Sequence, residues 1–193
     1  VLDKALNRNR SERYPSFSAF GDGLSRIRLR HLENIDAGKD YQILQYIGKG
    51  GFGEVFKGRE RNSGRVVAIK RLLRQDYIKR FELEANTLSR LKGPYFVKYI
   101  DHFKECRTGR TDAYLIMDFL PGMPGSSLRD AIKAEGGQGI DAKTVLIAFY
   151  RYALGLSAMH NGGVFHRDIK PSNLYFQAGR PETAVIMDFG IVR

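Results

Sequence analysis

The chain has 193 residues, of which 42% are hydrophobic and 27% are charged, a composition typical of a soluble globular protein with one good core or two small ones. Its single cysteine, Cys106, excludes an intrachain disulfide and favours a reducing, intracellular compartment over secretion. No apolar run approaches the ~20 residues that a membrane-spanning helix needs, so the sequence predicts no transmembrane segment.

The net charge of +11 is unevenly distributed. Residues 41–113 carry 16 Lys and Arg against 8 Asp and Glu, whereas residues 114–193 carry 8 against 7. A positive surface can attract nucleic acid, an anionic membrane or an acidic protein. Because no tight basic run is interleaved with aromatic residues, we favour a solvated basic surface, open to an acidic protein partner, over a nucleic-acid site.

Residues 1–40 show no clear hydrophobic period, and we interpret them as an N-terminal extension. Its aromatic residues could dock on the following domain, or the segment could be a flexible arm. The start of the chain is not a signal peptide. We therefore expect an intracellular protein that is cytoplasmic or reached an organelle with a targeting peptide since removed.

From Tyr41 the pattern predicts a strand, a glycine-rich turn, and further strands at 55–58 and 65–70. Backbone N–H groups in such a turn can approach phosphates because glycine has no side chain in the way. A dinucleotide-binding fold would need a helix after this turn, and the strand-forming residues that follow exclude it. The turn consists of Gly48, Lys49, Gly50, Gly51, Phe52 and Gly53.

The next segment has helical spacing. Glu84 lies beside its apolar face, where an unpaired carboxylate would be costly to bury, so we predict an ion pair between Glu84 and Lys70 on the preceding strand. Glu82 better fits a carboxylate that faces solvent. The apolar face is formed by Ile78, Phe81, Ala85, Leu88 and Leu91.

Two further strands are predicted at 95–103 and 113–119, and a glycine- and proline-rich connector follows at 121–126. Ser127 could cap a short helix that ends before the glycines at 136–139.

A longer helix at 141–160 is expected to begin with Asp141 as its cap. The residues that we place on its buried side are Val145, Phe149, Tyr152, Leu156 and Met159.

The stretch from His166 to Asn173 carries an acid, a cation and an amide, and a second acid, Asp188, follows fifteen residues after Asn173. Asp168 could accept a proton, and Lys170 could neutralise a phosphate. Asn173 and Asp188 offer the hard oxygen ligands that Mg²⁺ prefers. This combination suits a site that holds a divalent metal and steers a hydroxyl.

The order of these motifs resembles that of the eukaryotic protein kinases. The motifs are the glycine-rich turn, Val67-Ala68-Ile69-Lys70, Glu84, the His166–Asn173 stretch and Asp188-Phe189-Gly190. The resemblance covers residues 41–193. It implies an α+β, bilobal fold with a five-stranded antiparallel N-lobe sheet, one main N-lobe helix and an incomplete, mostly helical C-lobe.

The same resemblance divides the chain into three parts: an N-terminal extension at 1–40, an N-lobe at 41–118, and a hinge with a partial C-lobe at 119–193. The family continues beyond the Asp188-Phe189-Gly190 motif with an activation loop and several helices. We therefore expect these residues to be a portion of a longer polypeptide.

The resemblance implies ATP and Mg²⁺ as cofactors. Asp168 would orient and deprotonate the attacking hydroxyl, Lys170 would stabilise the transferring phosphoryl group, and Asn173 and Asp188 would hold Mg²⁺. Lys70, paired with Glu84, would position ATP. The implied nucleotide-binding residues are Gly48, Lys49, Gly50, Gly51, Phe52, Gly53, Val55, Ala68, Lys70, Met117 as gatekeeper, Asp118 and Leu120 of the hinge, and Tyr175.

Lys170 followed by Pro171 resembles the serine/threonine branch of the family. We therefore predict an ATP- and Mg²⁺-dependent kinase that phosphorylates Ser or Thr hydroxyls of a protein substrate, with the 193-residue portion alone inactive. The alternative is a weakly active or inactive kinase-like module that binds nucleotide and recruits partners. Tyr175 supports the alternative, because it replaces a leucine that forms the floor under adenine. His166 resembles a family histidine that packs against Phe189, so we assign it no role as a base.

Overall fold

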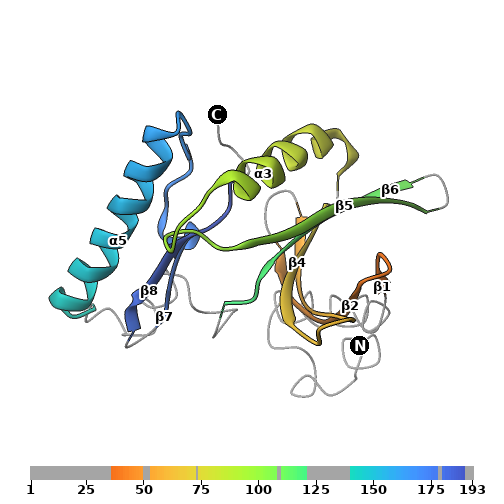
Figure 1. Ribbon diagram of the computed structural model, residues 1–193, viewed down its shortest axis with the longest axis horizontal. Coiled ribbons are helices and arrows are strands. Elements are labelled where there is room, and N and C mark those ends of the chain that lie inside the picture. Colours follow the sequence, from red (N-terminus) through yellow and green to blue (C-terminus); the bar gives the residue numbers. More distant parts are fainter. Residues whose placement is uncertain are drawn as a thin grey trace, which may run out of the picture.

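The computed structural model describes residues 36–49, 53–72, 74–107, 110–120, 140–177 and 180–189. A curled antiparallel sheet and helix α3 form one part of the molecule, and helix α5 with a two-stranded sheet forms the other (Figure 1). The predicted α+β architecture is therefore confirmed. The predicted connector at 121–126, the short helix after Ser127 and most of the N-terminal extension lie outside the described residues.

The first sheet has six strands rather than the predicted five. The additional strand, β1, pairs with the start of β2 through a tight turn in which Gly38 has a φ of +66°. Two residues are too short to show a hydrophobic period, so this strand escaped prediction. In the order β1-β2-β3-β4-β6-β5, the strands are β1 (Asp36–Ala37), β2 (Tyr41–Lys49), β3 (Gly53–Glu60), β4 (Val66–Leu72), β6 (Arg110–Asp118) and β5 (Tyr99–Arg107).

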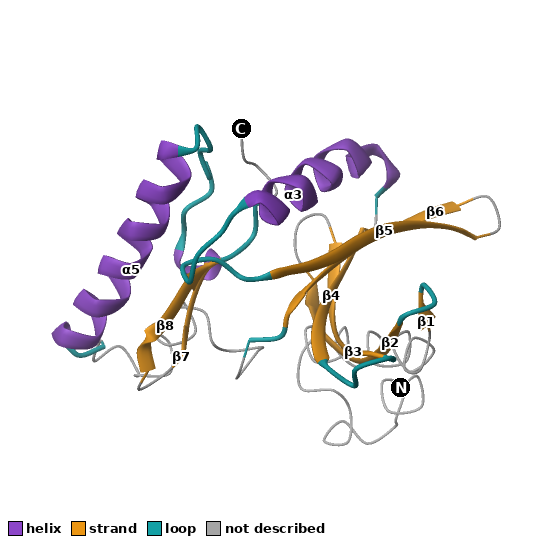
Figure 2. Cartoon of the chain, in the orientation of Figure 1, coloured by secondary structure: helices purple, strands orange, loops and turns teal. Residues whose placement is uncertain are grey.

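Helix α3 (Ile78–Arg90) follows a short 3-10 turn, η2 (Gln75–Tyr77), and packs against β5 (Figure 2). The predicted apolar face is confirmed, since the buried residues of α3 are Phe81, Glu84, Ala85 and Leu88. A hydrophobic core therefore forms beneath α3, and Glu84 is the one acidic residue of the helix that is buried in it.

The second part contains α5 (Ala142–Asn161), the 3-10 turn η3 (Pro171–Asn173), and the antiparallel strands β7 (Leu174–Gln177) and β8 (Arg180–Ile186). The predicted cap is confirmed, because the Thr144 amide donates to Asp141 Oδ1 at 3.0 Å.

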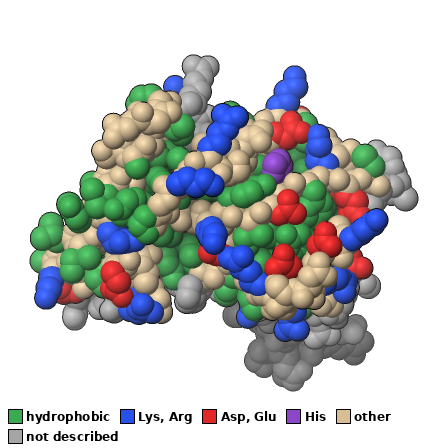
Figure 3. All heavy atoms as spheres, viewed as in Figure 1, with side chains coloured by type: hydrophobic (Ala, Val, Ile, Leu, Met, Phe, Trp, Pro, Cys, Tyr) green, Lys and Arg blue, Asp and Glu red, His purple; other side chains and the backbone are tan. Residues whose placement is uncertain are grey.

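The buried face of α5 differs partly from the prediction. Phe149 is 49% exposed, whereas the buried residues are Ala148, Tyr152, Gly155 and Met159. Exposed apolar side chains gather over α5, including Leu146 and Tyr150 (Figure 3). Because α5 is apolar on most sides, its hydrophobic periodicity does not indicate which face is buried.

The two parts share one hydrophobic core, which joins α3, the segment after it, α5 and the strands β7 and β8. A second cluster fills the other face of the curled sheet, around Phe56, Ile69 and Ile116. Among the described residues, we find no helix with both the length and the hydropathy that crossing a membrane would require.

Candidate active site

A cleft of about 410 Å³ lies where the six-stranded sheet and α3 face the second part of the protein. Polar residues from both parts line it together with apolar side chains of β3, β4 and the end of β6. The lining residues are Lys49, Gly53, Val55, Ala68, Lys70, Glu84, Leu88, Val97, Met117, Asp118, Leu120, Lys170, Ser172, Asn173, Met187, Asp188 and Phe189.

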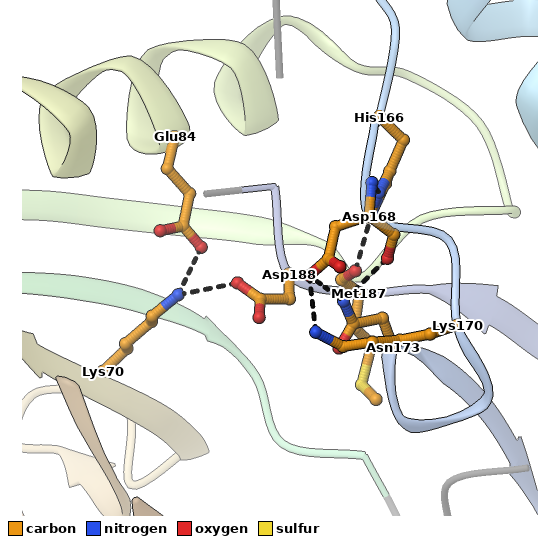
Figure 4. Close-up of polar contacts among 8 residues, drawn as sticks. All are labelled: Lys70, Glu84, His166, Asp168, Lys170, Asn173, Met187 and Asp188. Carbon is orange, nitrogen blue, oxygen red and sulfur yellow. Dashed lines mark hydrogen bonds and ion pairs between the residues drawn. The ribbon is translucent and has the colours of Figure 1, made fainter. Parts of the chain in front are cut away.

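Lys70, which lines this cleft, lies between the carboxylates of Glu84 and Asp188 (Figure 4). Its Nζ donates to Glu84 Oε1 at 2.6 Å and to Asp188 Oδ1 at 3.0 Å. Burial alone would lower the pKa of Lys70, but the two carboxylates raise it far above its ordinary value. The ammonium group therefore stays charged, and the predicted ion pair with Glu84 is confirmed.

The two carboxylates differ in their surroundings. The Glu84 side chain is 6% exposed, and that of Asp188 is 45% exposed. Burial raises the pKa of Glu84 despite the nearby Lys70. Burial also opposes the ionisation of Asp188, but Lys70 more than offsets it and lowers the pKa of this carboxyl. Asp188 has a φ of +60°, a left-handed conformation that is uncommon for non-glycine residues and that Asp adopts more readily than most.

Asp168, Lys170 and Asn173 form a second polar group, drawn beside Asp188 in Figure 4. Lys170 Nζ donates to Asp168 Oδ2 at 2.7 Å. Asn173 Nδ2 donates to the same oxygen and to the Asp168 carbonyl, both at 2.9 Å. These bonds fix the orientation of the Asp168 carboxylate. They engage only the side-chain nitrogen of Asn173, a buried residue, and an amide oxygen is a group that can bind a cation.

His166 holds this loop in place through two hydrogen bonds. Its Nδ1 accepts from the Asp168 amide at 3.3 Å, so the proton lies on Nε2, which donates to the Met187 carbonyl at 3.0 Å. The imidazole centre lies 5.2 Å from that of Phe189. The predicted packing of His166 against Phe189 is confirmed, and His166 ties the loop carrying Asp168 to the residue before Asp188.

The glycine-rich turn is described only at its ends. Lys49 and Gly53 line the cleft, Gly48 does not, and Gly50, Gly51 and Phe52 lie outside the described residues. A Cβ at Gly53 would lie 2.5 Å from the Arg71 carbonyl oxygen. Glycine is therefore required where β3 leaves the turn and pairs with β4.

Met117, predicted as the gatekeeper, and the predicted hinge residues Asp118 and Leu120 line the cleft, as do Val55 and Ala68. The Asp118 amide donates to the Lys98 carbonyl at 2.9 Å, and the Asp118 carboxylate is paired with Arg65. The Asp118 amide is therefore already engaged by the Lys98 carbonyl.

The role of Tyr175 under the nucleotide stays a prediction. Its ring is buried, at 1% exposure, and Tyr175 is not among the described residues that line the cleft. In β7 the side chains alternate between faces, and Leu174 and Phe176 enter the core shared with α5. The Tyr152 hydroxyl donates to the Tyr175 carbonyl at 2.7 Å, which holds this strand against α5.

Five residues that line the cleft were not predicted from the sequence: Leu88, Val97, Ser172, Met187 and Phe189. Three of them carried a usable signal. Leu88 lies one helical turn after Glu84 and so shares its face, and Met187 and Phe189 directly flank Asp188.

Asn173 and Asp188 offer oxygen ligands in one cleft, and Mg²⁺ prefers oxygen ligands. Among the described residues, no cluster of three or more His, Cys, Asp or Glu could hold a metal alone. Mg²⁺ commonly takes one or two protein oxygens and completes its shell with phosphate oxygens and water. The two residues therefore fit the ion when a phosphate ligand is present.

A family model described as the protein kinase domain matches residues 41–193. Similar curated proteins include the serine/threonine-protein kinase pkn2 of Myxococcus xanthus, which is 35% identical over 79% of this chain. The probable serine/threonine-protein kinase PknB of Bifidobacterium longum and the serine/threonine-protein kinase cot-1 of Neurospora crassa are each 32% identical, over 81% and 84% of this chain. The aligned part is 18%, 23% and 26% of the respective relatives.

Proposed function

Because this chain belongs to the protein kinase family, we propose that it acts in an ATP- and Mg²⁺-dependent serine/threonine protein kinase. The reaction transfers the γ-phosphoryl group of ATP to a Ser or Thr hydroxyl of a protein substrate. One observation carries the proposal: Lys70, paired with Glu84 and Asp188, lines the same cleft as Lys170 and Asn173.

In this proposal, Lys70 binds the α- and β-phosphates, and Glu84 holds the ammonium group in place. Asp168 accepts a hydrogen bond from the substrate hydroxyl and takes its proton as the new P–O bond forms and the bond from the γ-phosphorus to the departing ADP breaks. Lys170, already 2.7 Å from Asp168, neutralises charge on the transferring group. Phosphoryl transfer depends mainly on positioning and charge neutralisation, and these residues supply both.

Asn173 and Asp188 would hold Mg²⁺, which supplies charge neutralisation at the phosphate oxygens when it is bound. The pKa of Asp188 lies below its usual range, so the carboxylate is ionised and ready for a cation at neutral pH. The Asp118 carbonyl and Leu120, with apolar contacts from Val55, Ala68 and Met117, would contact the adenine ring.

The alternative is a weakly active or inactive kinase-like module. Its support was Tyr175 in place of the leucine expected under adenine, and Tyr175 is not among the described residues that line the cleft. The complete set of polar residues favours the enzyme.

The test is a transfer assay with the full-length protein, labelled ATP, Mg²⁺ and a generic serine/threonine acceptor. The parent should label the acceptor, and an Asp188→Ala variant should not. A rise in melting temperature with Mg-ATP but no transfer by the parent would support the nucleotide-binding module, because a ligand that binds only the folded state raises its stability.

A further inference from the structure

The segment that follows α3 is bonded directly to β8. The Ile186 amide donates to the Tyr95 carbonyl at 2.8 Å, and the Val97 amide donates to the Ile186 carbonyl at 3.2 Å. These bonds form a parallel bridge. Ile186 lies two residues before Asp188, so the end of the helix that carries Glu84 is connected to the strand that leads to Asp188.

Arg151 of α5 fastens this bridge from the side. Its Nη2 donates to the Pro94 carbonyl at 2.7 Å, and its Nε donates to the Ala184 carbonyl at 3.2 Å. The guanidinium carbon lies 5.3 Å from the centre of the Tyr95 ring. Pro94 directly precedes the bridge on one side, and Ala184 lies two residues before Ile186 on the other. Arg151 thus holds both sides of the bridge.

Arginine is suited to this task. Its planar guanidinium presents several donors in a fixed geometry and can stack on an aromatic ring at the same time, whereas a lysine ammonium is a single point on a flexible stem. Arg151 is half-buried, and it makes no ion pair with a carboxylate among the described residues. Among the described residues, its hydrogen bonds and its ring contact are with Pro94, Ala184 and Tyr95, at the bridge or directly beside it.

Gly155, one helical turn after Arg151, allows α5 to come close enough for these bonds. A Cβ at Gly155 would lie 2.9 Å from Tyr95 Cβ and 3.0 Å from Ile186 Cδ1. Both neighbours belong to the bridge. Arg151 and Gly155, at positions i and i+4, therefore lie on the same face of α5. Gly155 allows the close approach, and Arg151 makes the hydrogen bonds.

We propose that Arg151 is a positioning residue, which holds the loop after α3 against β8 and so keeps Glu84 and Asp188 at the spacing that Lys70 requires. Without the guanidinium, the C-terminal end of α3 is freer to move relative to β8. The Lys70–Glu84 ion pair is then formed for less of the time. The kinetic consequence rests on the proposed kinase activity, whereas the consequence for the bridge does not.

The kinetic test is a double-mutant cycle in the full-length protein. Arg151→Met is introduced into the parent and into a Glu84→Gln variant, and kcat/KM for ATP is measured for all four proteins. We expect a loss of about tenfold in the parent background and less than about twofold in the Glu84→Gln background, because residues that act through one another are not additive. Arg151→Lys, which retains one donor group, should give a smaller loss.

The second test is hydrogen exchange at the Val97 and Ile186 amides, which both donate across the bridge. Arg151→Met should speed exchange at these amides by about tenfold or more. Lys143→Met, which removes an exposed cation from the same helix, is the matched control and should change neither measurement. Should Arg151→Met fail to fold, Arg151→Lys is compared with the control instead.

The outcomes separate the two proposals. Equal losses of kcat/KM in both backgrounds, or unchanged exchange at both amides, would overturn the role of Arg151. If the parent transfers no phosphoryl group, the proposed function fails, and the exchange experiment alone decides whether Arg151 positions the loop.

Discussion

Replacing Lys70 by methionine should destabilise the protein more than replacing Glu84 by glutamine, because the two changes leave different charges behind. Lys70→Met removes the cation that faces both carboxylates, Glu84 at 2.6 Å and Asp188 at 3.0 Å. The Asp188 side chain is 45% exposed and can be hydrated, whereas that of Glu84 is 6% exposed and cannot. Glu84→Gln leaves Lys70 paired with Asp188.

The loss of stability in each variant follows from the charge that remains buried. Removing one partner of a buried ion pair costs about 3–5 kcal/mol. We expect the lower end, about 3 kcal/mol at pH 7, for Lys70→Met, because Glu84 can take up a proton. For Glu84→Gln, the amide oxygen can still accept from Lys70, and a loss of about 1 kcal/mol is expected.

The pH dependence has a defined sign. In Lys70→Met, burial keeps the pKa of Glu84 above its ordinary value of 4.5, with no cation to oppose it. The unfolded chain then loses this proton at lower pH than the folded protein does, so stability falls as pH rises above about 4.5. In the parent, Lys70 opposes this rise in the pKa of Glu84, so stability falls less over the same pH range. The deficit of the variant relative to the parent should therefore be smaller at pH 5 than at pH 7.

The assay is urea denaturation of the parent and both variants at pH 5 and pH 7. Lys104→Met is the matched control, because Lys104 also lies 2.6 Å from a carboxylate, Glu82, but its side chain is 52% exposed. Exposed pairs contribute little to stability, so its midpoint should change little. The reasoning is refuted if both lysine variants lose equal stability, or if the Lys70→Met deficit is the same at both pH values.

Three further predictions concern single residues. Asp188→Ala should lower phosphoryl transfer by about a thousandfold or more in the labelled-ATP assay, while circular dichroism stays unchanged; retained transfer would contradict its assignment. Gly155→Ala should destabilise the fold by about 1–3 kcal/mol through overpacking against Ile186, measured by urea denaturation, whereas Ser157→Ala on the exposed side of α5 should not. The hydrogen bond that caps α5 lowers the pKa of Asp141 from 3.8, so Asp141→Ala should reduce the melting temperature at pH 7, and this difference should shrink as pH falls below about 4.

Local signals were enough to predict the ion pair and much of the fold. Glu84 could be assigned to Lys70 because a carboxylate beside an apolar helix face needs a cation. Asp141 could be assigned as a cap because its position before a helical pattern is where a side-chain oxygen satisfies free amides. Both inferences depend on neighbours within a few residues or on one strong electrostatic requirement.

The features that sequence analysis missed depend on packing between distant segments. The face of α5 that becomes buried is set by Gly155, where the helix approaches Tyr95 and Ile186, and the apolar residues around the helix do not reveal this. Whether Tyr175 faces the cleft depends on the pairing of β7 with β8, which alternation along four residues did not specify.

The contacts of Arg151 could not be predicted for the same reason, because they join segments that are far apart in the sequence. Its acceptors are backbone carbonyls of Pro94 and Ala184, and a carbonyl has no residue type that a sequence could display. An arginine within an apolar helix gives no indication of such partners until the structure brings the three segments together.

We propose that the polar residues of the cleft bind one nucleotide together with its metal ion. The decisive experiment is a crystal structure of the full-length protein with Mg²⁺ and a non-hydrolysable ATP analogue. We expect phosphate oxygens within hydrogen-bonding distance of Lys70 Nζ and a Mg²⁺ ion bound to Asn173 and Asp188. A nucleotide that binds outside this cleft, or that binds within it without contacting Lys70, would show that these residues do not form the nucleotide site.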